Sequence, residues 1–197
     1  MQFANNYILI VIASLFIDGA PKLTSTDTTL RSREVSVDSL TLNPMEGIVY
    51  AGSIPFTGTS IKHFPNNLIS ERITYLNGKR EGQRQKWFAN GGLSYKAIYQ
   101  SNKLNGMAST WWYNGNLRST SHFEKGIAHG LQKQWYVSGQ VFKEQNLAFG
   151  KEKGIQKAWR KNGKIYVNYE AKNGRIFGLK RSNLCYELND ESIVYND

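Results

Sequence analysis

Glycine recurs along most of this chain at a fixed interval of 24 residues, and this period limits the possible folds more than any other feature. A tryptophan follows four of these framing glycines after five residues, and a further glycine follows each tryptophan four residues later. A fixed period of this length is typical of a repeat array, in which one small unit stacks on copies of itself. The framing glycines are Gly58, Gly82, Gly106, Gly130, Gly154 and Gly178, the tryptophans Trp87, Trp111, Trp135 and Trp159, and the later glycines Gly91, Gly115, Gly139 and Gly163.

Each repeat contains two short β-prone runs separated by residues that favour turns. In the repeat that begins at Gly106, Asn114-Gly115 lies between the runs 107–113 and 117–123. Asn-Gly in this setting predicts a hairpin with a type I′ turn, in which both central residues have positive φ. Lys125-Gly126 then turns the chain into the next hairpin. We therefore expect an all-β fold, an elongated antiparallel meander of stacked β-hairpins with a 24-residue period.

The alternation of side chains along a strand predicts which columns share a face of the sheet. Counted from each framing glycine, apolar residues occupy offsets 1, 5, 11 and 17, whereas the even offsets are mostly polar. We expect the odd offsets to form one apolar face, in which the tryptophans act as a structural ladder. Offset 6 differs from the other even positions, because Phe88, Trp112 and Tyr136 place aromatic rings on the opposite face near the turn. Exposed aromatic rings often mark contact surfaces, so these three residues are candidates for binding a partner.

The chain divides into four segments by composition. Residues 7–17 form an apolar run that is long enough for a signal-peptide core and short for a bilayer span. We expect residues 1–20 to be a signal peptide or an N-terminal anchor; a buried first strand or helix is the alternative. Residues 21–46 are rich in Ser, Thr and Asp and are interpreted as a linker or cap. The repeat array is expected over 47–188, and a C-terminal tail over 189–197.

The net charge of +10 is distributed unevenly. Residues 1–57 hold three bases and five acids, a net charge of −2, so residues 58–197 carry +12. This balance favours an anionic partner, such as a membrane surface or a polyanion; the alternative is that lysines keep the strand edges soluble and unpaired. A row of bases directly after the second turn is a second candidate contact. It consists of Lys79, Lys103, Lys151 and Arg175.

The sequence contains no arrangement typical of a catalytic or metal site. Its single cysteine, Cys185, allows no internal disulfide, and the three histidines His63, His122 and His129 occupy different offsets of the repeat. The glutamates of the array are scattered singly, and no phosphate-binding loop or dinucleotide fingerprint is present. We therefore expect a protein that is not an enzyme and that uses no metal, cofactor or small-molecule substrate.

The pattern Trp-x-x-Asn-Gly-x-Leu resembles the MORN-type repeat in its bacterial variant form. It is clearest over 111–117 and 87–93, with a related entry segment at 54–58, and the resemblance covers about residues 47–181. Many bacterial proteins of this kind are labelled as YwqK-type antitoxins of toxin–antitoxin systems, and eukaryotic relatives are associated with membranes, scaffolding and dimerisation. The resemblance implies a non-enzymatic hairpin array that binds another molecule, and it implies no catalytic residue.

Three functional hypotheses follow. The first is an exported or membrane-tethered scaffold (periplasmic, secreted or surface-bound) that binds a protein or another component of the cell envelope. The second is a cytoplasmic antitoxin whose sheet covers its toxin. The third is a basic protein that binds anionic lipid or nucleic acid.

Overall fold

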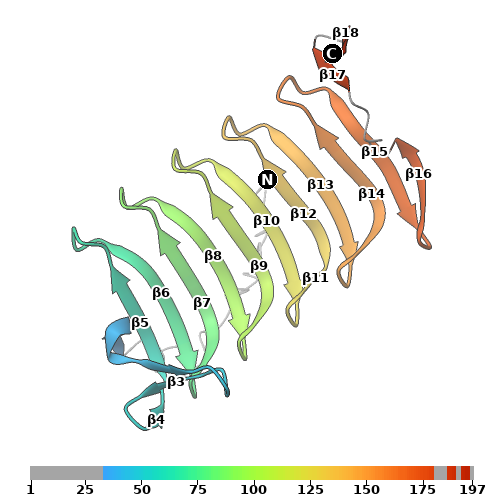
Figure 1. Cartoon of the computed structure of the whole chain (residues 1–197). Helices are drawn as coiled ribbons and strands as arrows, with labels where there is room; N and C mark the ends of the chain where they lie inside the picture. The colour runs from blue at the N-terminus through green and yellow to red at the C-terminus, as the bar shows by residue number, and fades with distance from the viewer. Residues whose placement is uncertain (1–32, 180–185, 190–191, 196–197) are drawn as a thin grey trace, which may run out of the picture.

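The structure, a computed structural model, describes residues 33–179, 186–189 and 192–195. Nearly all of these residues lie in strands or tight turns, and most of the strands form one long, bowed ribbon (Figure 1). The expected all-β meander of stacked hairpins is therefore confirmed. The expected signal peptide or anchor lies outside the described residues, as do Cys185 and part of the expected tail. No helix in the described part of the chain has the length and apolar character needed to cross a bilayer.

A 13-stranded sheet forms the body of the molecule, and sequential strands are neighbours along nearly all of it. From β5 onward every pairing is antiparallel, and β11 forms a short extra pair with β10. The strands of this part are β5 (Gly58–His63), β6 (Ile69–Leu76), β7 (Lys79–Trp87), β8 (Leu93–Gln100), β9 (Lys103–Trp111), β10 (Leu117–Glu124), β11 (Ile127–Ala128), β12 (Gly130–Trp135), β13 (Val141–Ala148), β14 (Lys151–Trp159), β15 (Ile165–Lys172) and β16 (Arg175–Leu179).

Short elements cover the first hairpins of the array. Strand β1 (Glu34–Ser36) pairs with β5 in parallel, and a 3-10 helix (Val37–Ser39) follows it. Strands β2 (Thr41–Asn43), β3 (Ile48–Ala51) and β4 (Ile54–Pro55) form a separate small sheet. Phe56 is 1% exposed and packs with Ile73 and Tyr75. At the other end of the chain, β17 (Tyr186–Asn189) pairs with β18 (Ser192–Tyr195).

The type I′ geometry that was predicted for the Asn-Gly turns occurs instead at the second turn of each repeat. At Asn114-Gly115 only the glycine has positive φ, and the Gly115 N–H donates to the Trp112 carbonyl oxygen, as in a type I turn closed by a left-handed glycine. The second turn of each repeat has two positive-φ residues, as in Lys125 (+51°) and Gly126 (+89°). The prediction of type I′ geometry was therefore wrong for the Asn-Gly turns. The Asn114 side chain instead accepts the backbone N–H of Asn116, which fits a type I turn.

A one-residue bulge follows each Asn-Gly-type turn and changes which columns share a face. Thr110 pairs with Ser119, whereas the next residue, Trp111, pairs with Leu117, so that Arg118 is an extra residue in β10. The other hairpins shift at the same position. Because side chains alternate along a strand, one extra residue moves the remainder of that strand to the other face. The expectation that offset 17 shares a face with offsets 1, 5 and 11 was therefore wrong.

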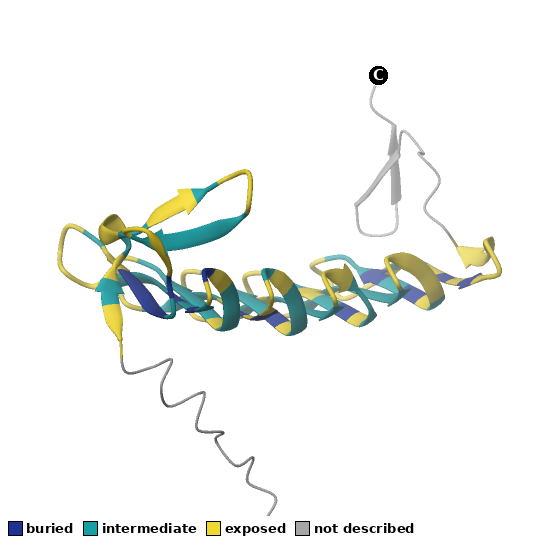
Figure 2. Ribbon diagram, turned by 90° about the horizontal axis from the view of Figure 1, so that it is seen from below, coloured by how far each residue is buried: buried dark blue, intermediate teal, exposed yellow. Residues whose placement is uncertain are grey.

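One face of the sheet is enclosed and the other is open. We define the enclosed face by the column that includes Ala97, Ala108 and Gln156, and the open face by Met107 and its equivalents Leu131 and Ile155. Ala108 and Gln156 are 9% and 1% exposed, whereas Met107 and Ile155 are 47% and 52% exposed. Buried stretches recur along this single layer of strands (Figure 2). The first apolar column thus lies on the open face, and the burial is on the other side.

Polar residues occupy buried positions on the enclosed face because they bind the backbone at irregular points of the ladder. The pairing of β13 with β14 shifts between Gln145 and Leu147. There the Gln156 side chain accepts the backbone N–H of Asn146 at 3.0 Å and donates to its carbonyl oxygen at 2.8 Å. The Gln132 side chain donates to three backbone carbonyl oxygens, those of His122, His129 and Gly130. Buried polar groups are tolerated when their hydrogen bonds are made in this way.

The four repeat tryptophans occupy equivalent, half-buried positions at the ends of their strands. Each lies opposite an aliphatic residue of the same hairpin; Trp111 pairs with Leu117, for example, and Trp135 with Val141. They lie on alternate strands, and two strand spacings amount to about 10 Å, which exceeds the range of a ring contact. Accordingly, no ring contact joins two of the four indoles in the described structure. They form a column of separate tryptophan–aliphatic pairs.

Candidate functional site

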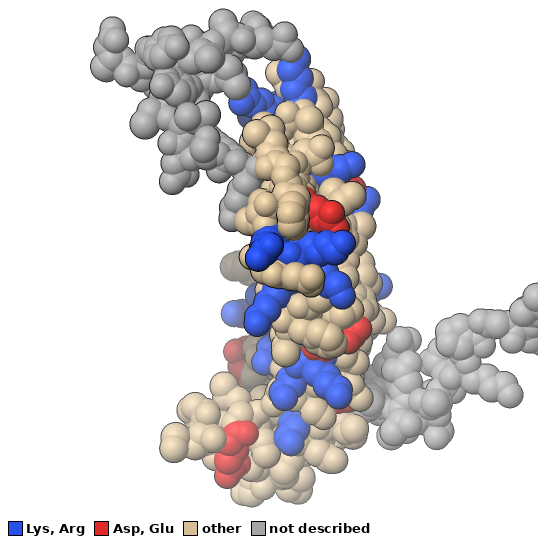
Figure 3. All heavy atoms as spheres, turned by 90° about the vertical axis from the view of Figure 1, so that its right-hand side faces the viewer, with Lys and Arg blue, Asp and Glu red and all other residues tan. Residues whose placement is uncertain are grey.

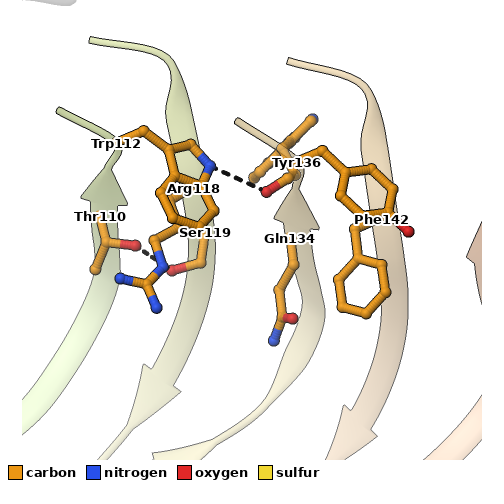
Figure 4. Close-up of a pocket in the computed structure, with 8 residues that line it drawn as sticks. Thr110, Trp112, Arg118, Ser119, Gln134, Tyr136 and Phe142 are labelled. Carbon is orange, nitrogen blue, oxygen red and sulfur yellow. Dashed lines mark hydrogen bonds between the residues drawn. The ribbon is translucent and has the colours of Figure 1, made fainter. Parts of the chain in front are cut away.

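A groove of about 580 Å³ lies on the enclosed face where two neighbouring hairpins meet. It spans the adjacent strands β9, β10, β12 and β13, near the Asn-Gly-type turns (Figure 4). Two aromatic walls flank a polar floor. Its lining residues are Thr110, Trp112, Arg118, Ser119, Gln134, Trp135, Tyr136 and Phe142.

The first wall is a stack of Arg118 on Trp112. The guanidinium carbon of Arg118 lies 4.6 Å from the centroid of the indole ring. Arg118 is the extra residue of the β10 bulge, and the bulge allows it to share a face with Ser119 beside it. The arginine is exposed, and no carboxylate in the described part of the chain forms an ion pair with it. Its N–H groups are therefore available for an acceptor.

The second wall is formed by Tyr136 and Phe142, which occupy the equivalent positions one repeat later. Their ring centroids are 5.1 Å apart, with the planes inclined at 55°. The Tyr136 hydroxyl donates to the Trp159 carbonyl oxygen at 2.8 Å. Burial raises the pKa of Tyr136, and the neighbouring Tyr166 raises it further. The hydroxyl is therefore a neutral hydrogen-bond donor at physiological pH.

The floor of the groove carries hydroxyl and amide groups. The hydroxyls of Thr110 and Ser119 are hydrogen-bonded to each other at 2.6 Å, and the Gln134 side chain extends between the two walls (Figure 4). Ser119 also pairs with Gln134 across β10 and β12, which keeps these groups on one face. None of the described residues that line the groove is acidic. The site therefore combines apolar walls, polar floor groups and one positive charge.

The walls also hold neighbouring hairpins together. The indole Nε1 of Trp112 donates to the Trp135 carbonyl oxygen at 3.1 Å, one repeat away. The Tyr136 hydroxyl makes the equivalent bond to the following repeat. Both side chains are fixed at one end by these bonds. They therefore present preorganised ring surfaces.

The structure brings together only two of the three aromatic residues predicted for partner binding. Trp112 and Tyr136 form the groove, whereas Phe88 lies outside it and packs against Tyr113, with ring centroids 5.3 Å apart. Phe88 is equivalent in position, since its N–H and carbonyl group make the same turn bonds as those of Trp112. Its hairpin carries Ser94 at the bulge instead of a large side chain. The wall at Phe88 therefore lacks its second large side chain.

The predicted row of bases lies at the opposite end of the strands. Its four members are each the first residue of a strand and all are exposed, but Ile127 occupies the equivalent position in the repeat between Lys103 and Lys151. The row is thus interrupted. Lysine and arginine predominate along the side of the ribbon seen in Figure 3. Residues 58–179 contain 20 bases and six acids, a net charge of +14.

A second polar cluster lies on the enclosed face of the first two repeats. Arg84 forms a 2.7 Å ion pair with Glu71, and the hydroxyls of Tyr95 and Tyr99 are 3.2 Å apart. Burial raises the pKa of Tyr99, but the hydrogen bond to Tyr95 and the charges of Arg84 and Arg80 outweigh it and lower the pKa overall. The ion pair and the tyrosine contacts fill this part of the face, so the cluster contributes to packing.

Two of the three histidines are neighbours in the structure, since the His129 backbone N–H donates to the His122 carbonyl oxygen at 2.9 Å. His129 also accepts the backbone N–H of Phe149 through Nδ1 at 3.4 Å, and its ring is tilted against the Phe149 ring. No group of three or more His, Cys, Asp or Glu side chains among the described residues could hold a metal ion.

Arg118, Gln134 and Phe142 are groove residues that the sequence pattern did not identify. Arg118 and Phe142 occupy offset 12. A regular alternation assigns this offset to the same face as offset 6, but the offset has no recurrent residue type that would mark it as part of a site. Their relevance comes from the bulge and from the contact with the preceding aromatic column. An arginine or an aromatic residue at offset 12, in a repeat that also has an aromatic residue at offset 6, could have indicated the groove from the sequence.

Comparison with models of known protein families found no match, and comparison with curated proteins found none either.

Proposed function

We propose that this protein is a non-enzymatic scaffold that binds a protein or another component of the cell envelope through the enclosed face of its hairpin array. The observation that carries the proposal is the groove between Trp112 and Phe142, which is preorganised, open to solvent and free of acidic lining residues. Concave sites with apolar walls and a few convergent polar groups are the usual form of a binding site. The resemblance to MORN-type repeats supports the same kind of role.

Export or membrane tethering is the second part of the proposal. It rests on the apolar run at residues 7–17, which has the length of a signal-peptide core. Mass measurement of the mature N-terminus after cell fractionation tests it. An intact Met1 in the cytosol would contradict export and would favour the antitoxin hypothesis.

Photo-crosslinking in the cell of origin tests the binding role. A photoreactive phenylalanine analogue at Phe142 places the reactive group in the groove, and the same analogue at Met45, which is 95% exposed in the cap, is the control. We expect a discrete adduct, with a protein or with an envelope polymer, from position 142 only. No adduct, or equal adducts from both positions, would contradict the proposal.

Binding to an anionic lipid or nucleic acid is a second candidate function, favoured by the net charge of +14 between residues 58 and 179. Such binding releases counterions and therefore weakens steeply with salt. Vesicle and oligonucleotide binding at two salt concentrations tests it. Neutralising the exposed row of Lys79, Lys103, Lys151 and Arg175 should flatten the salt dependence.

A further inference from the structure

We propose that the groove binds an acidic polysaccharide that carries about one carboxylate per disaccharide. This inference rests on the proposed binding role and names the chemistry of the ligand. A sugar ring has apolar C–H faces, hydrogen-bonding edges and, in a uronic acid, one negative charge. The groove offers the complement of each: ring walls, a floor of Thr110, Ser119 and Gln134, and Arg118.

Arg118 is the anchor for the carboxylate. Its guanidinium carbon lies 4.6 Å from the centroid of the Trp112 indole, and the side chain is exposed. An arginine fixed in this way can make two parallel hydrogen bonds to a carboxylate, which a lysine cannot. Because none of the described lining residues is acidic, such a ligand meets no like charge from them.

The repeat spacing extends the site along the ribbon. Three successive hairpins each contribute a basic side chain to this end of the enclosed face, at different positions of the repeat: Arg118, then Lys143, which pairs with Gln134, then Arg160, two residues after the buried Ala158. The guanidinium carbon of Arg160 lies 5.9 Å from the centroid of the Tyr166 ring. In this pair the arginine occupies offset 6 and the ring offset 12, whereas Trp112 occupies offset 6 and Arg118 offset 12. Successive hairpins are about 10 Å apart, which is similar to the length of an extended disaccharide.

Two other classes of polyanion fit less well. A single-stranded nucleic acid stacks its bases on ring faces, but Arg118 covers one face of Trp112, and Phe142 tilts against Tyr136. Its phosphates are also closer together than the hairpins. An acidic peptide would use the arginine and would leave the aromatic walls without a partner. These two classes are therefore outcomes that the test must separate from the polysaccharide.

Calorimetric titration of the full chain with a hyaluronan octasaccharide is the test, because hyaluronan has one carboxylate per disaccharide. The neutral chito-oligosaccharide of the same length, polyglutamate and oligo(dT) are the comparison probes. Charge-assisted hydrogen bonds contribute enough that Arg118→Gln should weaken hyaluronan binding by about tenfold or more. Arg33→Gln, which removes an exposed arginine just before β1 and outside the groove, should change it by less than about twofold.

We expect saturable binding of hyaluronan and weaker binding of the neutral oligosaccharide. Of the two arginine variants, only Arg118→Gln should lose affinity for hyaluronan. Arg118→Lys keeps the charge and should recover part of the affinity, and thermal melts of all variants show whether each is folded. No hyaluronan binding, equal binding of polyglutamate or oligo(dT), or equal loss in both arginine variants would overturn the inference. If a partner is crosslinked at position 142 but the titration detects no hyaluronan binding, the polysaccharide inference is rejected and the proposed binding role is retained.

Discussion

The indole Nε1 of Trp112 donates a hydrogen bond to the carbonyl oxygen of Trp135, 3.1 Å away in the next hairpin. This bond couples two repeats whose tips are also joined by hydrogen bonds from the Asn114 and Asn116 side chains to the Val137 carbonyl oxygen. Trp112→Phe removes the donor and keeps an aromatic ring, so we expect a loss of unfolding free energy of about 1 kcal/mol from the hydrogen bond, beyond the loss of packing. Trp111→Phe is the control, since Trp111 makes no such bond in the described structure. Urea titrations of both variants measure the difference; equal losses would contradict the coupling.

Gly78 is one of the points at which the small sheet of β2, β3 and β4 contacts the array. Its φ is +74°, and a Cβ there would collide with Ile48 and lie 2.7 Å from the Val49 carbonyl oxygen. Gly115 has a similar φ of +87° with open space around it. Gly115→Ala should therefore cost only the conformational penalty of about 1–2 kcal/mol. Gly78→Ala should cost a further 1–3 kcal/mol or so from overpacking, measured by thermal or urea unfolding. Similar costs for the two variants would show that the cap does not pack there.

Lys125 occupies the first central position of a type I′ turn at φ +51°, a conformation that suits asparagine better than lysine. Lys125→Asn should therefore stabilise the chain by about 0.5–1 kcal/mol. Lys96→Asn removes the same charge from an extended strand, where asparagine is unfavourable, and should not stabilise. If both substitutions change the melting temperature in the same direction, the turn assignment at Lys125-Gly126 is wrong.

The buried Tyr169 makes the array sensitive to alkaline pH. Burial, the 2.8 Å hydrogen bond to Glu152 and the charge of that carboxylate raise the pKa of Tyr169 to about 12. Because this exceeds the ordinary value of 10.0, its contribution to stability is complete below about pH 10 and is lost as the pH rises toward 12. Tyr169→Phe should flatten the loss of stability over that range, and Glu152→Gln should do so in part. An unchanged alkaline profile in Tyr169→Phe would contradict the assignment.

The repeat period was sufficient to predict the architecture. The regularly spaced glycines predicted the number of hairpins, and the β-prone runs between them predicted the positions of the strands. Both predictions succeeded because turns and strands depend on the conformational preferences of nearby residues. The turn types were predicted less well. Asn-Gly suits more than one turn, and the number of residues between the last paired positions decides which of them forms.

The assignment of faces failed for a different reason. The pattern gives no sign that Arg118, Phe142 and their equivalents are extra residues, yet each reverses the alternation of its strand. For the same reason simple alternation places Ser119, at offset 13, on the wrong face, although it lines the groove. Trp112 and Tyr136 were identified because they are aromatic residues at an otherwise polar offset.

Cysteine accessibility tests the central structural claim, that the small and polar column faces inward while the column of Met107, Leu131 and Ile155 faces solvent. In a background with Cys185→Ser, single cysteines at each of these positions and at the residues directly after them form three adjacent pairs, with Ala108, Gln132 and Gln156 as the second members. We expect rapid labelling by a thiol reagent at 107, 131 and 155, and strong protection at 108, 132 and 156 in the native protein. Equal rates within each pair, or protection at 107, 131 and 155, would contradict the account.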